Sequence, residues 1–177
     1  MVKSGSEGPS MMIATPSEVP AAAAAVALCG AYRHAVDAKG RVAVPALLRR
    51  GLPEASVVGP NPDHRLGIWP PDAWEREVAR FRRFAETPAQ RDRLERQVMA
   101  LTFPFEVDAQ GRMLLTAAQR SWASITGAAV FVGLGRCVEI VGEQRWDADD
   151  LDLDPDEFTR LHELVHRADD VSPGAPQ

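Results

Sequence analysis

Two copies of one short stretch decide the fold: Val36-Asp37-Ala38-Lys39-Gly40-Arg41-Val42 and Val107-Asp108-Ala109-Gln110-Gly111-Arg112-Met113. The second copy follows the first at an offset of 71 positions, and the residues around both copies align at the same offset. Further along, Ile68 to Glu75 aligns with Ile140 to Asp147 at an offset of 72. Repeats of this kind are supersecondary units that bury their apolar faces against one another. The sequence therefore predicts two modules built on one plan.

Each copy predicts a β-hairpin followed by a short helix. A short strand leads into the turn, where Gly40 and Gly111 supply a positive φ, and an apolar run predicts the returning strand. Pro45 and Gly51 then bound a helix over residues 46–50, and Gly127 is expected to end its counterpart in the second copy. Further strands are expected near residues 55–58, 66–69, 128–132 and 136–141.

A helical linker is expected between the modules. Asp72 with Glu75 resembles a capping box and precedes an apolar stripe at helical spacing: Trp74, Val78, Phe81 and Ala85. Thr87-Pro88 opens a second helix with an apolar face formed by Leu94, Val98 and Leu101. The linker arginines either lie on solvated faces beside glutamates or contact DNA or another subunit: Arg76, Arg80, Arg82, Arg83, Arg91, Arg93 and Arg96.

The composition is that of a globular protein that needs neither metal nor disulfides to fold. Of 177 residues, 45% are apolar and 25% are charged, and the chain has two cysteines, Cys29 and Cys137. Two cysteines are too few for a disulfide framework and lack the spacing of a zinc site, so a reducing cytoplasm is the expected compartment. No segment reaches the roughly 20 apolar residues of a membrane span.

The first 28 residues are rich in Ser, Gly, Pro and Ala and predict a disordered leader. The alternative is an export signal, because an apolar run over residues 21–28 precedes Cys29. Glu7 and Glu18 stand where such a signal needs positive charge, and Leu28 is bulky where cleavage needs a small residue. These features favour the leader.

The net charge of −5 is unevenly distributed along the chain. From Glu143 onward there are eleven acidic residues and three arginines, so this segment carries −8 and residues 1–142 carry +3. Salt screens charges that are more than about 10 Å apart. The acidic C-terminal part therefore does not exclude a polyanionic ligand for the rest of the chain.

The paired turns are the best functional candidates. An Asp and an Arg four residues apart across a tight turn can meet on one face, so that the carboxylate holds the guanidinium while the turn projects it. A fixed guanidinium matches phosphate or a guanine edge, and Lys39 adds a charge beside Arg41. The alternative is an ion pair that only closes the turn and contributes at most about 1 kcal/mol. The residues alone leave both interpretations open.

The turns belong to a longer pattern. It consists of the segment Gly30 to Pro45, which contains the first turn, the segment Trp69 to Glu75 with basic linker helices after it, and the second turn with the segment Gly133 to Trp146. Together they resemble the MraZ family of transcriptional regulators. The resemblance implies an α+β fold of tandem swapped-hairpin modules, related to AbrB and antitoxin DNA-binding domains, that form a double-split β-barrel. It also implies ring-shaped homo-oligomers that bind double-stranded DNA at promoter repeats of the division and cell-wall gene cluster. Such proteins often act as repressors, in the cytoplasm and at the nucleoid.

The resemblance implies five segments: a leader (1–28), a first AbrB-like module (29–75), linker helices (76–101), a second module (102–146), and an acidic C-terminal helix and tail (147–177). It implies DNA contacts by Arg41 and Arg112, with Arg33, His34 and Lys39 beside them. The turns are expected to be braced by Asp37, Gly40, Asp108 and Gly111. We expect no catalytic residue, no metal and no cofactor, and so no enzyme.

Two positions depart from the family pattern. Thr116 replaces a proline, which is expected to weaken the start of the helix in the second copy. Gln110 replaces a basic residue, so the first copy is expected to dominate the affinity for DNA.

Two features of the sequence are typical of functions other than DNA binding. A protein-interaction or antitoxin-like assembly module is the main alternative, because acidic residues repel DNA but can bind a basic partner. A remote alternative is a zinc metalloprotease, because His162-Glu163-Leu164-Val165-His166 matches the HExxH pattern. A third ligand on rigid structure is lacking, since only eleven residues follow His166. The sequence instead predicts a helix over residues 155–167 with Phe158, Leu161 and Val165 facing inward.

Overall fold

The computed structural model describes residues 28–84, 87–148 and 154–170. Its strands are β1 (Cys29–Ala35), β2 (Arg41–Ala43), β3 (Val57–Asn61), β4 (Arg65–Trp69), β5 (Phe103–Pro104), β6 (Arg112–Leu114), β7 (Ala128–Leu134) and β8 (Val138–Gly142). Its helices are α2 (Ala46–Arg50), α3 (Pro71–Phe84), α4 (Pro88–Ala100), α5 (Ala117–Trp122), α6 (Glu143–Ala148) and α7 (Pro155–Asp170).

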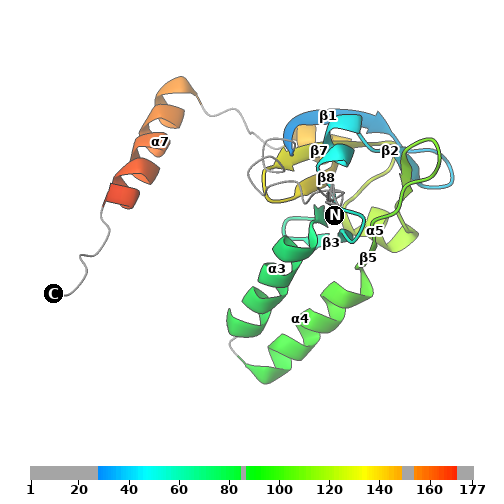
Figure 1. Cartoon of the computed structure of the whole chain (residues 1–177), viewed down its shortest axis with the longest axis horizontal. Coiled ribbons are helices and arrows are strands. Elements are labelled where there is room, and N and C mark those ends of the chain that lie inside the picture. The colour runs from blue at the N-terminus through cyan, green and yellow to red at the C-terminus, as the bar shows by residue number, and fades with distance from the viewer. Residues whose placement is uncertain (1–27, 85–86, 149–153, 171–177) are drawn as a thin grey trace, which may run out of the picture.

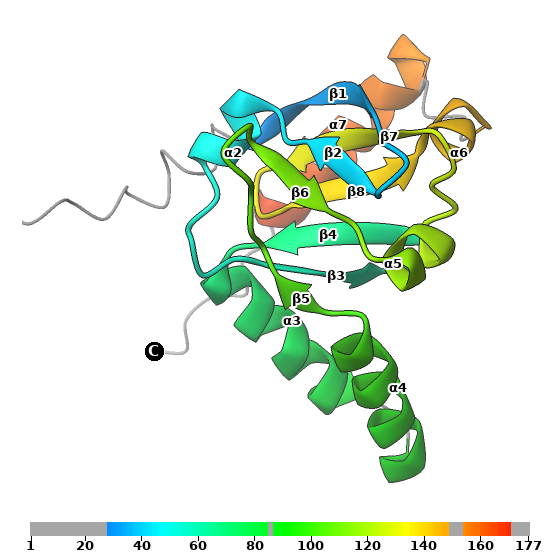
Figure 2. The same cartoon turned by 90° about the vertical axis from the view of Figure 1, so that its right-hand side faces the viewer.

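The strands form a six-stranded antiparallel sheet, in the order β1-β7-β8-β4-β3-β5, and a separate two-stranded ribbon of β2 and β6. The ribbon lies across one face of the sheet (Figure 2), where Val42 and Met113 share a core with sheet residues. Helices α3 and α4 project beyond β5 as a helical arm (Figure 1). The α+β class is confirmed, and β1 and β5 are the edges of an open sheet rather than neighbours in a closed barrel.

The two repeat copies exchange strands. β1 pairs with β7 over seven residue pairs, from Cys29↔Leu134 to Ala35↔Ala128, and β2 pairs with β6. Within the described residues, β1 and β2 are joined by the single bridge Val36↔Val42. The prediction of a local hairpin in each copy is therefore wrong for the strand pairing, although both turns form. An isolated two-stranded hairpin cannot bury its apolar face, whereas exchanged strands enclose one core.

Both copies contribute to that core. Leu48 and Leu66 of the first copy and Phe131 and Ile140 of the second are fully buried in one cluster. The equivalent strands β4 and β8 are hydrogen-bonded neighbours in the sheet. Fully burying one such side chain stabilises the fold by about 1.5–3 kcal/mol, so the fold depends on residues from both copies. Leu28, which the sequence places at the end of the leader, also packs in this core; the other leader residues lie outside the described ranges.

The observed bounds of the two short helices agree in part with those predicted from the sequence. α2 spans the predicted residues, and the backbone N–H of Gly51 bonds to Leu48 O. α5 ends at Trp122, well before Gly127, because Ser124 adopts a left-handed φ of 53° that stops the helix. Thr116 does not weaken the start of α5. It forms a capping box with Gln119: the Thr116 hydroxyl accepts from the backbone N–H of Gln119, and the Gln119 side chain accepts from the backbone N–H of Thr116. Proline has neither a hydroxyl nor a backbone N–H and could form neither bond.

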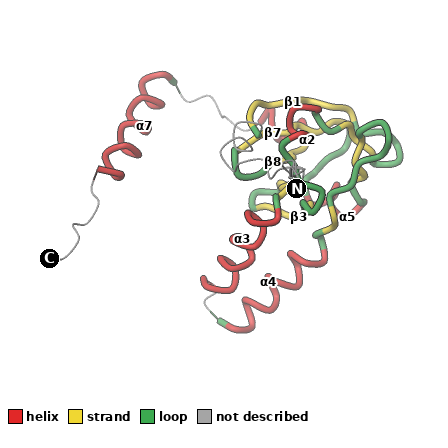
Figure 3. The backbone as a smooth tube through the Cα atoms, in the orientation of Figure 1, coloured by secondary structure: helices red, strands yellow, loops and turns green. Residues whose placement is uncertain are grey.

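The helical arm is stabilised at its surface. α4 begins directly after Thr87, as predicted, and Thr87 caps it through a capping box with Gln90. Ion pairs join Arg76 to Asp72 and Arg82 to Glu95, so these arginines lie beside acidic residues. Ala85, at the end of the predicted stripe, lies outside the described residues. Figure 3 shows α3 and α4 side by side, extending away from most of the sheet.

α7 forms where the sequence predicts a helix, but its apolar side chains do not face inward. Phe158, Leu161 and Val165 are 57%, 40% and 63% exposed, and Figure 1 shows α7 apart from the sheet. Apolar residues at helical spacing indicate that a helix has an apolar face. They do not indicate which surface, if any, of the same chain packs against that face. Among the described residues, no helix combines the length and apolarity needed to cross a bilayer.

Candidate nucleic-acid interface

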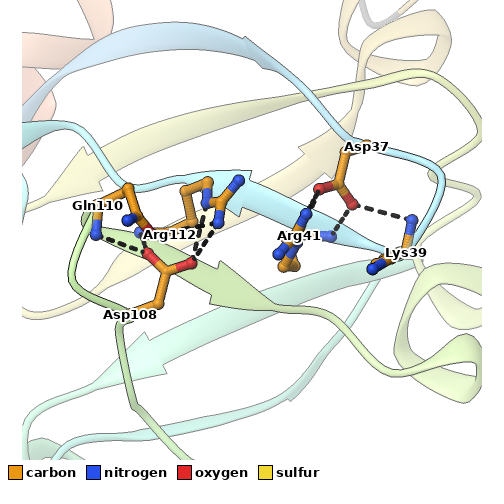
Figure 4. A network of polar contacts seen from close by, with 6 residues as sticks. All are labelled: Asp37, Lys39, Arg41, Asp108, Gln110 and Arg112. Carbon is orange, nitrogen blue, oxygen red and sulfur yellow. Dashed lines mark hydrogen bonds and ion pairs between the residues drawn. The ribbon is translucent and has the colours of Figure 1, made fainter.

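The first turn is a closed network around Asp37. Its Oδ1 accepts hydrogen bonds from the backbone N–H groups of Lys39 and Arg41, both at 2.9 Å. Its Oδ2 accepts from Nε and Nη2 of Arg41, both at 2.7 Å. The N–H of Gly40 bonds to Asp37 O at 2.8 Å, and Gly40 has a φ of +84°. One carboxylate thus holds both the backbone of the turn and the guanidinium (Figure 4).

The second turn repeats this network. Asp108 Oδ1 accepts from the backbone N–H groups of Gln110 and Arg112 at 3.0 and 2.9 Å. Its Oδ2 accepts from Nε and Nη2 of Arg112 at 2.9 and 2.7 Å. Gly111 has a φ of +74°. The structure therefore brings Asp37 together with Gly40 and Arg41, and Asp108 together with Gly111 and Arg112.

These hydrogen bonds lower the pKa of both carboxyl groups. The backbone N–H of Arg41, followed by its side chain, lowers the pKa of Asp37 from 3.8 to about 2. The side chain of Arg112, followed by its backbone N–H, lowers the pKa of Asp108. Both carboxylates are therefore charged at neutral pH and keep their guanidinium groups in place.

The two turns differ in how many guanidinium N–H donors remain for a ligand. A guanidinium has five N–H donors, of which Asp37 takes one from Nε and one from Nη2 of Arg41. Arg112 gives the same two to Asp108 and a further Nη2 hydrogen to Gln110 Oε1 at 3.2 Å. Arg41 thus keeps one more donor than Arg112, and its neighbour Lys39 is exposed.

The ribbon sets the relative position of the turns. β2 and β6 pair Arg41↔Leu114, Val42↔Met113 and Ala43↔Arg112. Val42 and Met113 are buried, so the alternate residues share the outer face. The side chains of Arg41 and Arg112 on this face are 35% and 31% exposed. Because each turn precedes its strand in an antiparallel ribbon, the turns lie at its opposite ends (Figure 4).

Each turn is held in place by the other copy. The N–H of Leu115 bonds to Gly40 O at 2.9 Å, and the N–H of Val44 bonds to Gly111 O at 3.0 Å. The guanidinium of Arg120 from α5 lies against Gly40 and donates to Leu115 O.

The equivalent arginine of the first copy, Arg49 from α2, lies against Gly111. Sequence reasoning missed both Arg49 and Arg120. Their spacing of 71 positions, which is the repeat offset, was the available signal.

Arg33 and His34 lie outside this cluster, on β1. Arg33 forms ion pairs with Glu143 and Asp147 of α6, both at 2.6 Å, and these carboxylates raise its pKa, with Asp147 contributing most. The ring of His34 packs edge-on against Phe131 of β7 at a centroid distance of 6.2 Å. The structure thus engages both side chains with α6 and β7 rather than with the turn residues.

The HExxH segment lies on α7. His162 packs beside Phe158, with ring centroids 5.8 Å apart, and the side chain of His166 is outside the described residues. Within the described part of the chain, no group of three or more His, Cys, Asp or Glu side chains is arranged to hold a metal ion.

Known proteins resemble this chain over most of its length. Residues 27–96 match the sequence model of the family described as "MraZ protein, putative antitoxin-like". A protein of Herpetosiphon aurantiacus named Transcriptional regulator MraZ is 36% identical over 136 residues, which cover 77% of this chain and 94% of the relative. Proteins of the same name from Heliobacterium modesticaldum and a Thermoanaerobacter species are 36% and 30% identical and align over 82% and 99% of their own lengths. The chain therefore belongs to the MraZ family.

Proposed function

We propose that this protein is a sequence-specific DNA-binding regulator of transcription that reads DNA with the β2–β6 ribbon and its two turns. The observation that carries the proposal is the pair of braced guanidinium groups, Arg41 and Arg112, on one exposed face of the ribbon. The relatives named as transcriptional regulators support it.

The chemistry of the face suits a nucleic acid. Arginine held by a carboxylate loses little further freedom on binding, and its remaining donors match phosphate or the O6 and N7 of guanine. A two-stranded ribbon fits the major groove, which is about 12 Å wide. The charge of +3 over residues 1–142 favours approach to a polyanion.

The proposed contact set includes Lys39, which adds an exposed positive charge beside Arg41. Because Arg41 keeps one more donor than Arg112, the first copy supplies the larger part of the affinity. Arg33 and His34 of β1 would join the contact, and Arg33 would then exchange the carboxylates of α6 for phosphate.

The finer features of the proposal rest on the family resemblance. They are the five segments of the expected domain organisation, a double-split barrel arrangement of the sheet and the ribbon, and ring-shaped homo-oligomers. They also include binding at promoter repeats of the division and cell-wall gene cluster, repression, and a place at the nucleoid in the cytoplasm. Several copies on adjacent repeats would gain affinity through avidity, because one small ribbon offers few base contacts.

The direct test begins with genomic DNA fragments selected by the full chain. Fluorescence anisotropy then gives the affinity of the wild type and of Arg41→Ala for the selected duplex. Loss of one bidentate contact worth about 1–3 kcal/mol predicts roughly 5–150-fold weaker binding. The matched control is Arg76→Ala, which breaks an Asp–Arg pair of the same spacing on the helical arm and should bind normally. Unchanged affinity of a folded Arg41→Ala protein would remove the turn from the reading surface.

A second candidate function is an antitoxin-like or assembly module. The description of the matching family as antitoxin-like and the exposed apolar side chains of α7 favour it. Co-purification after nuclease treatment separates the two functions: a partner protein that stays bound without DNA supports the module, whereas selective recovery of one DNA sequence supports the regulator.

A further inference from the structure

The outer face of the ribbon carries an apolar side chain between the two braced arginines. Leu114 is 60% exposed, although its neighbour Met113 is buried. One exposed leucine is ordinary on a protein surface, so exposure alone carries no functional meaning. The position of Leu114 is informative, because the strand register fixes which residues lie beside it.

The register places Leu114 directly opposite Arg41 and two residues from Arg112 on the same strand. Side chains directly opposite each other in an antiparallel pair have Cβ atoms about 4.5–5.5 Å apart. The short ribbon cannot slip, since Val42 and Met113 anchor it in the core. The face therefore presents an aliphatic group at a fixed place beside a fixed guanidinium.

The repeat makes this face asymmetric. The residue equivalent to Leu114 in the first copy is Ala43, which lies opposite Arg112. Leucine extends further from the ribbon than alanine, so only the Arg41 end of the face has an apolar side chain that projects well beyond the backbone. The two arginines at equivalent repeat positions thus have different apolar neighbours on this face.

We propose that Leu114 contacts the 5-methyl group of a thymine in the major groove, next to a guanine bound by Arg41. The inference rests on the proposed DNA-binding function. Thymine differs from cytosine at the groove edge by this methyl group, which accepts apolar contact, while arginine selects guanine. The protein therefore prefers a guanine with a thymine close to it at one end of its site, and a weaker thymine preference at the other end, where Ala43 is too short.

The test removes single methyl groups from the DNA. The probe is the duplex recovered from genomic DNA by the full chain, in which each thymine in turn is replaced by deoxyuridine. Wild type should lose about fourfold in affinity at one thymine, the loss expected from one buried methyl group. Leu114→Ala should bind the unmodified duplex more weakly and show no loss at that same position. Its unfolding temperature should match that of the wild type, because the side chain is exposed.

A gain-of-contact variant provides the second arm. Ala43→Leu should create a new deoxyuridine sensitivity at the other end of the site. Equal deoxyuridine profiles for wild type and Leu114→Ala, with binding still dependent on Arg41, would overturn the thymine contact and leave DNA binding by the turns intact. Failure of the full chain to select any sequence would overturn both the contact and the proposed function.

Discussion

The guanidinium of Arg120 lies against Gly40, a turn residue of the other repeat copy. The backbone reinforces this contact, because Leu115 donates its N–H to Gly40 O at 2.9 Å. Arg49 and Gly111 stand in the same relation at the other end of the ribbon. Neither turn is therefore an independent loop, since each is held by a helix arginine and by the backbone directly after the ribbon strand of the other copy.

Gly40→Ala should destabilise the fold more than an ordinary glycine substitution. An alanine at φ +84° is strained and also collides with Arg120 and with Leu115 O. Gly135→Ala is the matched control, since Gly135 has a φ of +74° but open space around it. The strain alone costs about 1–2 kcal/mol, so Gly135→Ala should lose that amount and Gly40→Ala should lose more. Urea denaturation measures both, and equal losses would argue against the cross-copy contact.

Asp37 should titrate far below a normal aspartate. Because its pKa is lowered to about 2 from 3.8 in the folded protein, its stabilising effect is complete above about pH 4 and is lost as the pH falls through 2. Carboxyl-carbon NMR should give a midpoint near pH 2. Arg41→Ala should move the midpoint only part of the way towards 3.8, because the backbone N–H of residue 41 still donates. A wild-type midpoint near 3.8 would contradict the brace.

Gln119 should be a stabilising buried polar residue. Its side chain donates to Val58 O at 3.3 Å and Leu101 O at 3.1 Å, and it also closes the capping box of Thr116. Gln119→Leu removes a side-chain donor from each of these two buried carbonyl oxygens, so a loss of about 2–4 kcal/mol is expected. Gln90→Leu, which breaks the equivalent capping box at an exposed site on α4, should lose at most about 1 kcal/mol. Comparable losses in thermal or urea unfolding would show that the buried carbonyls do not matter.

Removing the chain after Ala148 should leave the fold intact and strengthen DNA binding at low salt. The described apolar side chains of α7 are exposed, so the unfolding temperature should not fall. The removed segment holds nine acidic residues and two arginines, and its repulsion of DNA should weaken as the salt concentration rises and the screening length shortens. Anisotropy titrations at two salt concentrations measure this difference.

A full-length control separates charge from chain length. Asp156→Asn, Glu157→Gln and Glu163→Gln together remove three acids from α7 and should shift the low-salt affinity in the same direction by a smaller amount. A truncated protein that binds less tightly would instead show that the C-terminal part takes part in DNA binding or assembly.

Local chemistry let the sequence predict part of this protein. The conformation of the two turns, the start of α4 after Thr87 and the extent of α2 depend mainly on hydrogen bonds between residues at most four positions apart, so neighbouring residues indicate them. The sequence pattern also located the strands to within a few residues. It did not predict which strands pair, because β1 pairs with β7 and β2 with β6 across about 70 to 100 positions.

The tertiary structure alone decided the surroundings of the functional candidates. It placed Arg33 against the carboxylates of α6, put Arg120 over Gly40, and aligned Leu114 with Arg41 on one face. It also left the apolar face of α7 exposed. These relationships join distant segments, and their energies depend on the shared burial of both copies in one core, which no single stretch of sequence encodes. The sequence by itself determined the two braced arginines, and the exchange of strands between copies determined that they share one face.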